Sequence, residues 1–296
     1  MDCLILRSAA DVSDCQQLCE LSGLSGLRNK NRDQGYKMKF QGKKTRSGVG
    51  PHAPLFLERP TDKGIVVFIH GFMGSPRQFD RLAETVYREG RSAATLLLPG
   101  HGGSAKEFES GTFERWQGYV DAEVERFAKD YNDIWLVGHS MGGLLAINAA
   151  VKYSDYIRGI QTIATPFELT KSYTHSTKVR IMSLFSRGGS SMKSAYLAVC
   201  SIQPSPSLLW RTARPIAEVK KLMQAARDNL PDVSVPVTAV FSVSDELTSI
   251  SSLDIIREGL KRAVFKHLLL TDSLHAYYPE HELSQIESAL VSLVLA

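Results

Sequence analysis

Short apolar runs alternate with segments of helical periodicity from about residue 53 onward. Apolar residues spaced three and four apart predict helices over 75–90, 112–130, 142–153, 249–263 and about 280–295. The apolar runs are rich in β-branched residues, as buried strands are, and predict strands over 64–70, 92–98, 133–140, 159–166, 235–243 and 264–271. This alternation predicts an α/β fold, a mostly parallel sheet with helices on both faces and functional residues at the carboxyl ends of its strands.

The same pattern predicts three regions. Residues 1–50 lack a clear period and are expected to form a weakly ordered extension, in which Met38 is an alternative start. Residues 51–166 and 231–296 hold the strands and helices of the core. Residues 167–230 contain no clear strand and are too long for a plain loop, so we expect an inserted helical cap over the site.

A glycine-rich turn carries the first chemical signal. Gly138-His139-Ser140-Met141-Gly142 fits G-x-S-x-G, lies after an apolar strand and precedes a helix of small residues. In this setting a serine sits on a strained strand-to-helix turn, where larger neighbours would clash. We therefore predict Ser140 as a nucleophile, against the alternative of an ordinary glycine-rich turn.

A serine nucleophile needs a base and an acid that orients the base, and in this arrangement the chain order is Ser, acid, His. Asp245 directly follows the strand over 235–243, and His275 follows the strand over 264–271. Both are therefore expected at the same sheet edge as Ser140. Glu246 and Asp272 are the rival acids, and three further residues are less suited by their places in the pattern: Asp254, His267 and His281.

Two backbone N–H groups are expected to bind the oxyanion of a tetrahedral intermediate. One belongs to Met141, the residue after the nucleophile. The other belongs to Phe72, because Gly71 lets the chain turn towards the site after the strand over 64–70. His70 and His101, in neighbouring glycine-rich turns, are interpreted as structural anchors.

Composition narrows the class of protein. The 296 residues are 43% hydrophobic, and no apolar run approaches the roughly 18 residues of a membrane span. The start lacks the features of a secretory signal, and the four cysteines suggest neither a disulfide framework nor a zinc site, so we expect a cytoplasmic protein without a metal. The basic stretch near residues 28–46 is expected to be a solvated tail rather than a nucleic-acid site.

Five motifs in order, HGFMGS, LLLPGHGGS, GHSMGG, SVSDE and SLHAYYPE, resemble those of bacterial carboxylesterases and monoacylglycerol lipases of the α/β-hydrolase superfamily. The resemblance covers about residues 60–296. It implies an α/β-hydrolase fold and cleavage of small carboxylic esters of apolar acids without a cofactor. A carbon–carbon bond lyase or hydrolase of the same fold and a non-enzymatic receptor on this fold remain alternatives.

The expected cap adds a substrate hypothesis. Its large apolar side chains are candidates for an acyl pocket, among them Leu184, Phe185, Met192 and Trp210. Residues 166–230 hold ten Lys or Arg and three Asp or Glu, which disfavours a peptidase that binds a cationic amine. The same charge leaves transient contact with an anionic lipid surface open. The sequence leaves the oligomeric state undetermined.

Overall fold

The chain divides into two units, Met1–Phe40 and Gln41–Ala296. The structure is a computed structural model, and every residue that it describes belongs to the second unit. The described residues are 43–46, 50–59, 64–170, 199–202 and 208–296.

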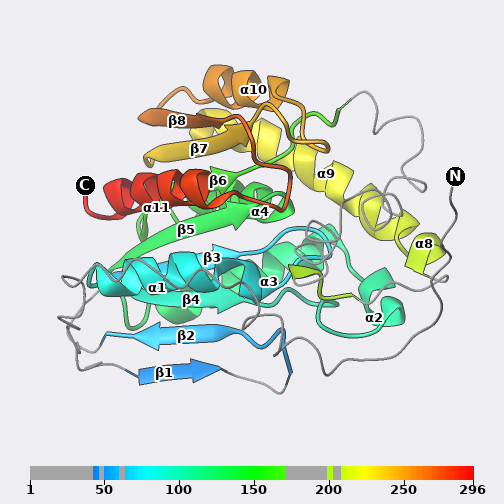
Figure 1. The fold of residues 1–296 in the computed structure, drawn as a ribbon, viewed down its shortest axis with the longest axis horizontal. Helices are drawn as coiled ribbons and strands as arrows, with labels where there is room; N and C mark the ends of the chain where they lie inside the picture. The colour runs from blue at the N-terminus through cyan, green and yellow to red at the C-terminus, as the bar shows by residue number, and fades with distance from the viewer. Residues whose placement is uncertain (1–42, 47–49, 60–63, 171–198, 203–207) are drawn as a thin grey trace, which may run out of the picture. The chain divides into compact units, whose positions relative to one another are not determined.

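Eight strands form one sheet in the order β1-β2-β4-β3-β5-β6-β7-β8. The strands from β3 to β8 pair in parallel, whereas β2 pairs antiparallel with both β1 and β4 (Figure 1). The predicted mostly parallel sheet is therefore confirmed. The strands are β1 (Lys43–Arg46), β2 (Leu55–Glu58), β3 (Gly64–Ile69), β4 (Ser92–Leu96), β5 (Asp133–His139), β6 (Ile157–Ile163), β7 (Val237–Ser242) and β8 (Phe265–Leu270).

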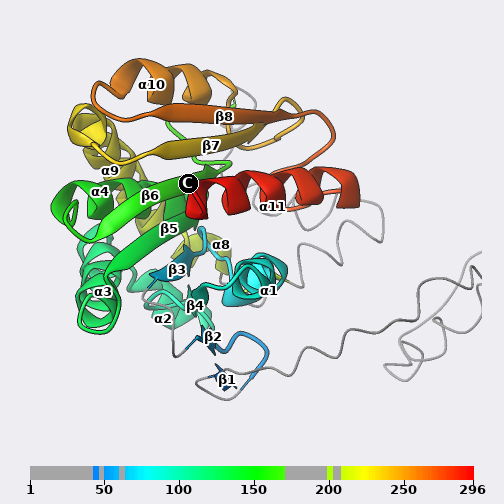
Figure 2. The same ribbon diagram turned by 90° about the vertical axis from the view of Figure 1, so that its left-hand side faces the viewer.

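Helices cover both faces of the sheet. Figure 2 shows α1 and α11 on one face and α3, α4 and α9 on the other. Among the described residues, no helix is both long and apolar enough to cross a membrane. The helices are α1 (Asp80–Arg88), α2 (Ala105–Glu109), α3 (Phe113–Phe127), α4 (Met141–Lys152), α8 (Leu208–Arg211), α9 (Ala213–Asn229), α10 (Ser251–Gly259) and α11 (Glu280–Val294), with short 3₁₀ turns at Pro76–Phe79 and Leu230–Asp232.

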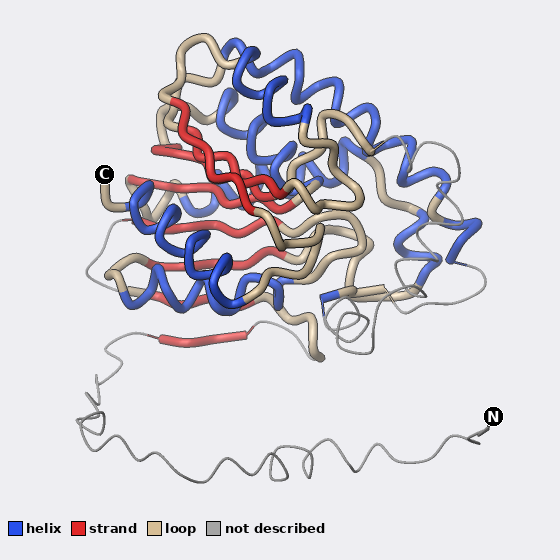
Figure 3. The backbone as a smooth tube through the Cα atoms, turned by 45° about the horizontal axis from the view of Figure 1, so that its top comes forward, coloured by secondary structure: helices blue, strands red, loops and turns tan. Residues whose placement is uncertain are grey.

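The central strands are buried on both faces because their side chains alternate between two hydrophobic cores. In β3, Ile65 and Val67 pack into the core shared with α3 and α4. Val66 and Phe68 pack into the opposite core, beneath α1 and α11. Successive side chains of a strand point to opposite faces of the sheet, so a strand that is buried on both faces is apolar at every position. The loops after the parallel strands then gather along one edge (Figure 3).

Two boundaries differ from the sequence-based prediction. Strand β1 lies within residues 1–50, which were expected to form a weakly ordered extension, and it pairs with β2. The predicted cap, residues 167–230, includes α9, whose side chains Leu222 and Ala226 join the main hydrophobic core beside α4. Their spacing of four residues places both on one face of α9, so this helix is part of the core layer as well as a cover.

Candidate active site

The turn from β5 to α4 holds Ser140 in an unusual backbone conformation. Ser140 has φ 53° and ψ −120°, one of three non-glycine residues with positive φ in the described part of the chain. A hydrogen bond of 2.8 Å from its N–H to the carbonyl oxygen of Ile163 fixes the turn to β6. Such strain is maintained only where surrounding packing enforces it, and it often marks a functional position.

Glycines make this packing possible. A Cβ on Gly142 would lie 2.0 Å from the carbonyl oxygen of Ile69, and one on Gly138 would lie 2.3 Å from that of Gly142. A Cβ on Gly143 would lie 1.9 Å from Oγ1 of Thr165. We call residues 138–143, which hold the predicted nucleophile, the nucleophile turn. It is packed against the backbone of β3 and the side chain of Thr165, beyond the end of β6, too closely for a residue larger than glycine.

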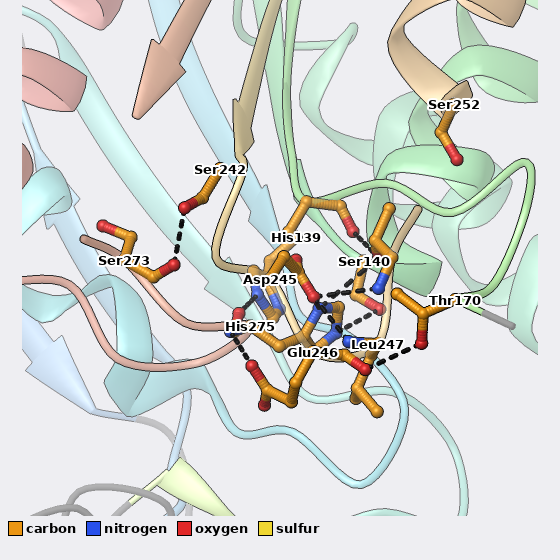
Figure 4. A network of polar contacts seen from close by, with 12 residues as sticks. His139, Ser140, Thr170, Ser242, Asp245, Glu246, Leu247, Ser252, Ser273 and His275 are labelled. Carbon is orange, nitrogen blue, oxygen red and sulfur yellow. Dashed lines mark hydrogen bonds and ion pairs between the residues drawn. The ribbon is translucent and has the colours of Figure 1, made fainter. Parts of the chain in front are cut away.

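The three residues predicted as nucleophile, base and acid come together at the carboxyl edge of the sheet (Figure 4). Oγ of Ser140 lies 3.0 Å from Nε2 of His275. Nδ1 of His275 lies 3.0 Å from Oδ2 and 3.2 Å from Oδ1 of Asp245. Each of the three residues is less than 10% exposed. With Nδ1–H donating to Asp245, Nε2 is free to accept the hydroxyl proton of Ser140.

The electrostatics of this row follow from the pairing of His275 with Asp245. Burial opposes a charge on His275, but the Asp245 carboxylate and its hydrogen bond outweigh burial and raise the pKa of His275 above its ordinary 6.5. Burial likewise opposes ionisation of Asp245. The neighbouring imidazole, together with 2.8 Å bonds from the N–H groups of Leu247 and Thr248, lowers the pKa of Asp245. Asp245 is thus an oriented carboxylate.

The backbone of His275 is held by three side chains that the sequence analysis did not assign to this task. Nε2 of His139 lies 2.7 Å from the carbonyl oxygen of His275, and the hydroxyl of Tyr278 donates to the same oxygen at 3.0 Å. Burial and then His275 lower the pKa of His139 to about 3, so it is a neutral donor. Glu246, the rival acid, instead accepts the N–H of His275 at 3.0 Å.

We call residues 271–278 the histidine loop. Its start is held by Glu282, a buried carboxylate in the first turn of α11. Glu282 accepts hydrogen bonds from the N–H and hydroxyl of Thr271, the N–H of Asp272 and the hydroxyl of Ser273. Burial opposes ionisation, but these bonds outweigh it and lower the pKa of Glu282 to about 2. No short motif announces such a contact, because it depends on where α11 docks.

One group of side chains in the described residues could bring three donor atoms to a metal. Asp272, His281 and Glu282 each offer an atom within 4.8 Å of the others. Glu282 already accepts hydrogen bonds from the histidine loop, and Asp272 pairs with His281 at 3.3 Å. We therefore interpret this group as contacts that hold the histidine loop against α11, and the expected absence of a metal stays a prediction.

The two predicted oxyanion donors face the same pocket as Ser140. Phe72 and Met141 both line it, and neither N–H has a hydrogen-bond partner among the described residues. Hydrogen bonds to two histidine side chains hold the loop that carries Phe72 to the turn after β4. His70 accepts the N–H of Leu98 at 3.0 Å, and His101 accepts that of Met73 at 3.2 Å, so their interpretation as structural anchors is confirmed.

An apolar pocket opens over Ser140. Its described lining includes Met73, Leu169, Val199, Ile216, Val219, Met223 and Leu247.

None of the four residues predicted to line an acyl pocket is found in the described lining. Leu184, Phe185 and Met192 lie outside the described residues. Trp210 is 69% exposed in the short helix α8 and does not line the pocket, so that prediction was wrong: the pocket is lined by the following helix, α9.

Sequence comparisons identify related proteins. A family model described as Serine aminopeptidase, S33, matches residues 60–203. A thermostable monoacylglycerol lipase from Bacillus sp. (strain H-257) is 24% identical over 211 residues, which cover 71% of this chain and 82% of the lipase. A 2-succinyl-6-hydroxy-2,4-cyclohexadiene-1-carboxylate synthase from Salmonella paratyphi C is 38% identical over 91 residues, 29% of this chain and 32% of the synthase.

Solved structures share the fold. The monoacylglycerol lipase of Paleococcus ferrophilus superposes with a TM-score of 0.60 at 18% identity, and the match covers 86% of this chain and 99% of the lipase. At this identity the likeness establishes the architecture alone.

Proposed function

We propose that this chain, an α/β-hydrolase that resembles monoacylglycerol lipases and esterases, cleaves carboxylic esters of apolar acids through a covalent acyl-enzyme. One observation carries the proposal. Ser140, strained and buried at the base of an apolar pocket, lies 3.0 Å from the Nε2 of a histidine that is itself paired with a buried carboxylate. This is the constellation that serine acyl transfer needs.

The proposed reaction uses only side chains and backbone of this chain. Oγ of Ser140 attacks the ester carbonyl carbon while Nε2 of His275 takes its proton, and Asp245 stabilises the imidazolium. The N–H groups of Phe72 and Met141 bind the oxyanion. The alkoxide leaves with the proton from His275, and an acyl group remains on Ser140. Water then attacks this ester while His275 takes its proton, and His275 gives that proton to the departing Oγ of Ser140 as the acid is released.

The alternative carbon–carbon lyase has a specific observation in its favour, the 38% identity to the synthase over 91 residues. The two reactions differ in a measurable intermediate. An acyl-enzyme produces a burst of p-nitrophenol from a p-nitrophenyl ester and a serine adduct of matching mass. A site that binds such esters without acyl transfer to Ser140 gives neither.

An aminopeptidase function, which the description of the family model suggests, fits the pocket less well. A peptide amine is a cation and needs a carboxylate to receive it. The described lining contains no Asp or Glu and contains one cation, Lys220. Aminoacyl p-nitroanilides should therefore be poor substrates compared with p-nitrophenyl esters of similar size.

The deciding experiment combines labelling with turnover. A fluorophosphonate probe should label the wild-type enzyme, and p-nitrophenyl esters from acetyl to palmitoyl should report the preferred acyl length. Ser140→Ala should abolish labelling and lower kcat/KM on the order of 10⁴-fold or more. Ser292→Ala, on the exposed face of α11, is the matched control. Activity of Ser140→Ala within tenfold of wild type would overturn the proposal, and absent labelling would favour a non-enzymatic receptor.

A further inference from the structure

Lys220 is out of place on an apolar wall. Helix α9 lines the pocket with Ile216, Val219, Lys220 and Met223, the i, i+3, i+4 and i+7 positions of one helical face. Ile216, Val219 and Met223 pack against the hydrophobic cores. Lys220 is the one charged residue in the described lining of the pocket that holds Ser140. Its side chain is exposed, which places the charge towards the solvent side of that wall.

The neighbouring lysine shows what an ordinary surface role looks like. Nζ of Lys221 lies 2.7 Å from Oε1 of Glu218, and this carboxylate also accepts the N–H of Phe113 at the start of α3. Lys221 is therefore engaged with the protein, away from the pocket lining. Lys220 has no carboxylate within 4.0 Å among the described residues. Two adjacent lysines on one helix thus have different surroundings.

The stretch of chain before α9 adds positive charge around Lys220 and no carboxylate. Between Glu168 and Glu218 the sequence contains seven Lys or Arg and no Asp or Glu. The carboxylate proposed for catalysis, Asp245, is buried behind His275 and already accepts hydrogen bonds from three groups. A pocket with apolar walls and one cation that forms no ion pair among the described residues is suited to an amphiphile that carries a negative charge.

We infer that Lys220 is a specificity-determining residue, which binds a carboxylate or phosphate group on the ester substrate while the apolar wall contacts the hydrocarbon part. The inference rests on the proposed ester hydrolysis and adds the substrate class: anionic esters are preferred to neutral esters of the same size. The anion lies either at the far end of the acyl chain or on the alcohol half. The shared chemistry is an oxygen anion that pairs with an ammonium group.

Two matched substrate pairs separate these sources. For the acyl half, the p-nitrophenyl monoester of adipic acid is compared with its methyl ester, which lacks the charge. For the alcohol half, 1-oleoylglycerol 3-phosphate is compared with 1-oleoylglycerol. The measured quantity is the ratio of kcat/KM for the anionic member to that for the neutral member, in wild type, Lys220→Gln, Lys220→Glu and the control Lys221→Gln.

Wild type should favour the anionic member of one pair about fivefold, near the upper end for an ion pair that solvent can reach. Lys220→Gln should bring this ratio close to one, and Lys220→Glu should invert it. Lys221→Gln should leave the ratio at the wild-type value. Added KCl should reduce the preference, because salt screens exposed charges. The pair that responds identifies the half of the substrate that carries the anion.

A ratio near one in wild type for both pairs would overturn the inference, as would equal losses in Lys220→Gln and Lys221→Gln. These results are distinct from failure of the proposed function. If neither neutral nor anionic esters are hydrolysed, and the fluorophosphonate does not label Ser140, the ester hydrolase proposal itself fails. If neutral esters are hydrolysed without a charge preference, only the role of Lys220 is refuted.

Discussion

Oγ of Ser140 lies 3.0 Å from Nε2 of His275, yet different interactions hold the two residues in place. The nucleophile turn is fixed by close packing: its glycines contact the backbone of β3 and the side chain of Thr165 too closely for a Cβ to fit. The histidine loop follows β8, the outermost strand of the sheet at that side. Polar side chains hold it in place, namely Glu282, Glu246, His139 and Tyr278. One partner is fixed by shape and the other by hydrogen bonds.

This difference predicts how each region fails. A close-packed interior tolerates almost no added volume, so a larger residue in place of a glycine of the nucleophile turn should damage folding itself. A hydrogen-bonded loop can lose one bond and remain folded, so a substitution around the histidine loop should damage turnover before stability. Four experiments test this contrast.

The largest effect is expected for Gly142→Ala. The added Cβ would lie 2.0 Å from the carbonyl oxygen of Ile69, so the turn must move or the chain must unfold. We expect a loss of at least about 3 kcal/mol in the free energy of unfolding, measured by urea denaturation. Gly118→Ala in α3 is the control, because its Cβ would meet nothing within 4 Å. That variant should gain up to about 1 kcal/mol. Equal stabilities of the two variants would refute the packing account.

Asp245→Asn should leave the fold intact and lower kcat on the order of 10⁴-fold, because the neutral amide neither stabilises the imidazolium nor fixes its tautomer. Glu246→Gln should cost far less, since the amide oxygen can still accept the N–H of His275. Both variants are measured by kcat on a neutral p-nitrophenyl ester, with circular dichroism as the check on folding. Greater damage from Glu246→Gln would assign the acid role to Glu246.

The contrast also explains what the sequence could predict. The nucleophile turn is local: strand, glycines, serine and helix follow one another within a few residues, so Ser140 and the N–H of Met141 could be proposed from the pattern alone. Asp245 and His275 could be proposed because each directly follows an apolar run, and the carboxyl ends of parallel strands share an edge. The order of elements therefore predicted both the sheet and the residues that meet in it.

Contacts between distant segments could not be predicted in the same way. In the sequence, Glu282 is one of two acidic residues at the start of a helix, and nothing distinguishes it from Glu280. Only the packing of α11 shows that Glu282 is buried, whereas the side chain of Glu280 is 77% exposed. Strand β1 contains three basic residues in four and has no apolar alternation to announce it. Trp210 was proposed from residue type, but it is 69% exposed in α8, and residues of α9 line the pocket instead.

Glu282→Gln tests the polar side of the contrast. The amide offers one acceptor oxygen where the carboxylate offers two, so part of the bonding to Thr271, Asp272 and Ser273 is lost. A small displacement of His275 should lower kcat on the order of 10- to 100-fold and change KM little. Activity is measured well below the unfolding temperature of the variant.

Glu280→Gln is the matched control, because Glu280 lies in the same first turn and pairs only with Arg81 among the described side chains. It should retain nearly full kcat. If Glu282→Gln also retains full kcat, or if it raises KM without lowering kcat, the loop does not depend on this carboxylate for the position of His275.

The smallest effect concerns pH, and it separates the electrostatic role of Glu246 from its bond to the loop. His275 must be neutral to take the proton of Ser140, so kcat/KM should fall as pH drops through the pKa of His275. Because the Asp245 carboxylate outweighs burial and raises that pKa, the acid limb should have its midpoint above pH 6.5. The charge of Glu246 also raises the pKa of His275, so Glu246→Gln should move the acid limb to lower pH and leave the plateau of kcat/KM nearly unchanged.

Asp254→Asn is the control, because it removes an exposed charge in α10, and it should leave the acid limb in place. A limb that stays fixed in Glu246→Gln would show that Glu246 acts on His275 through its backbone bond alone, and a limb that moves to higher pH would contradict the electrostatic role of Glu246.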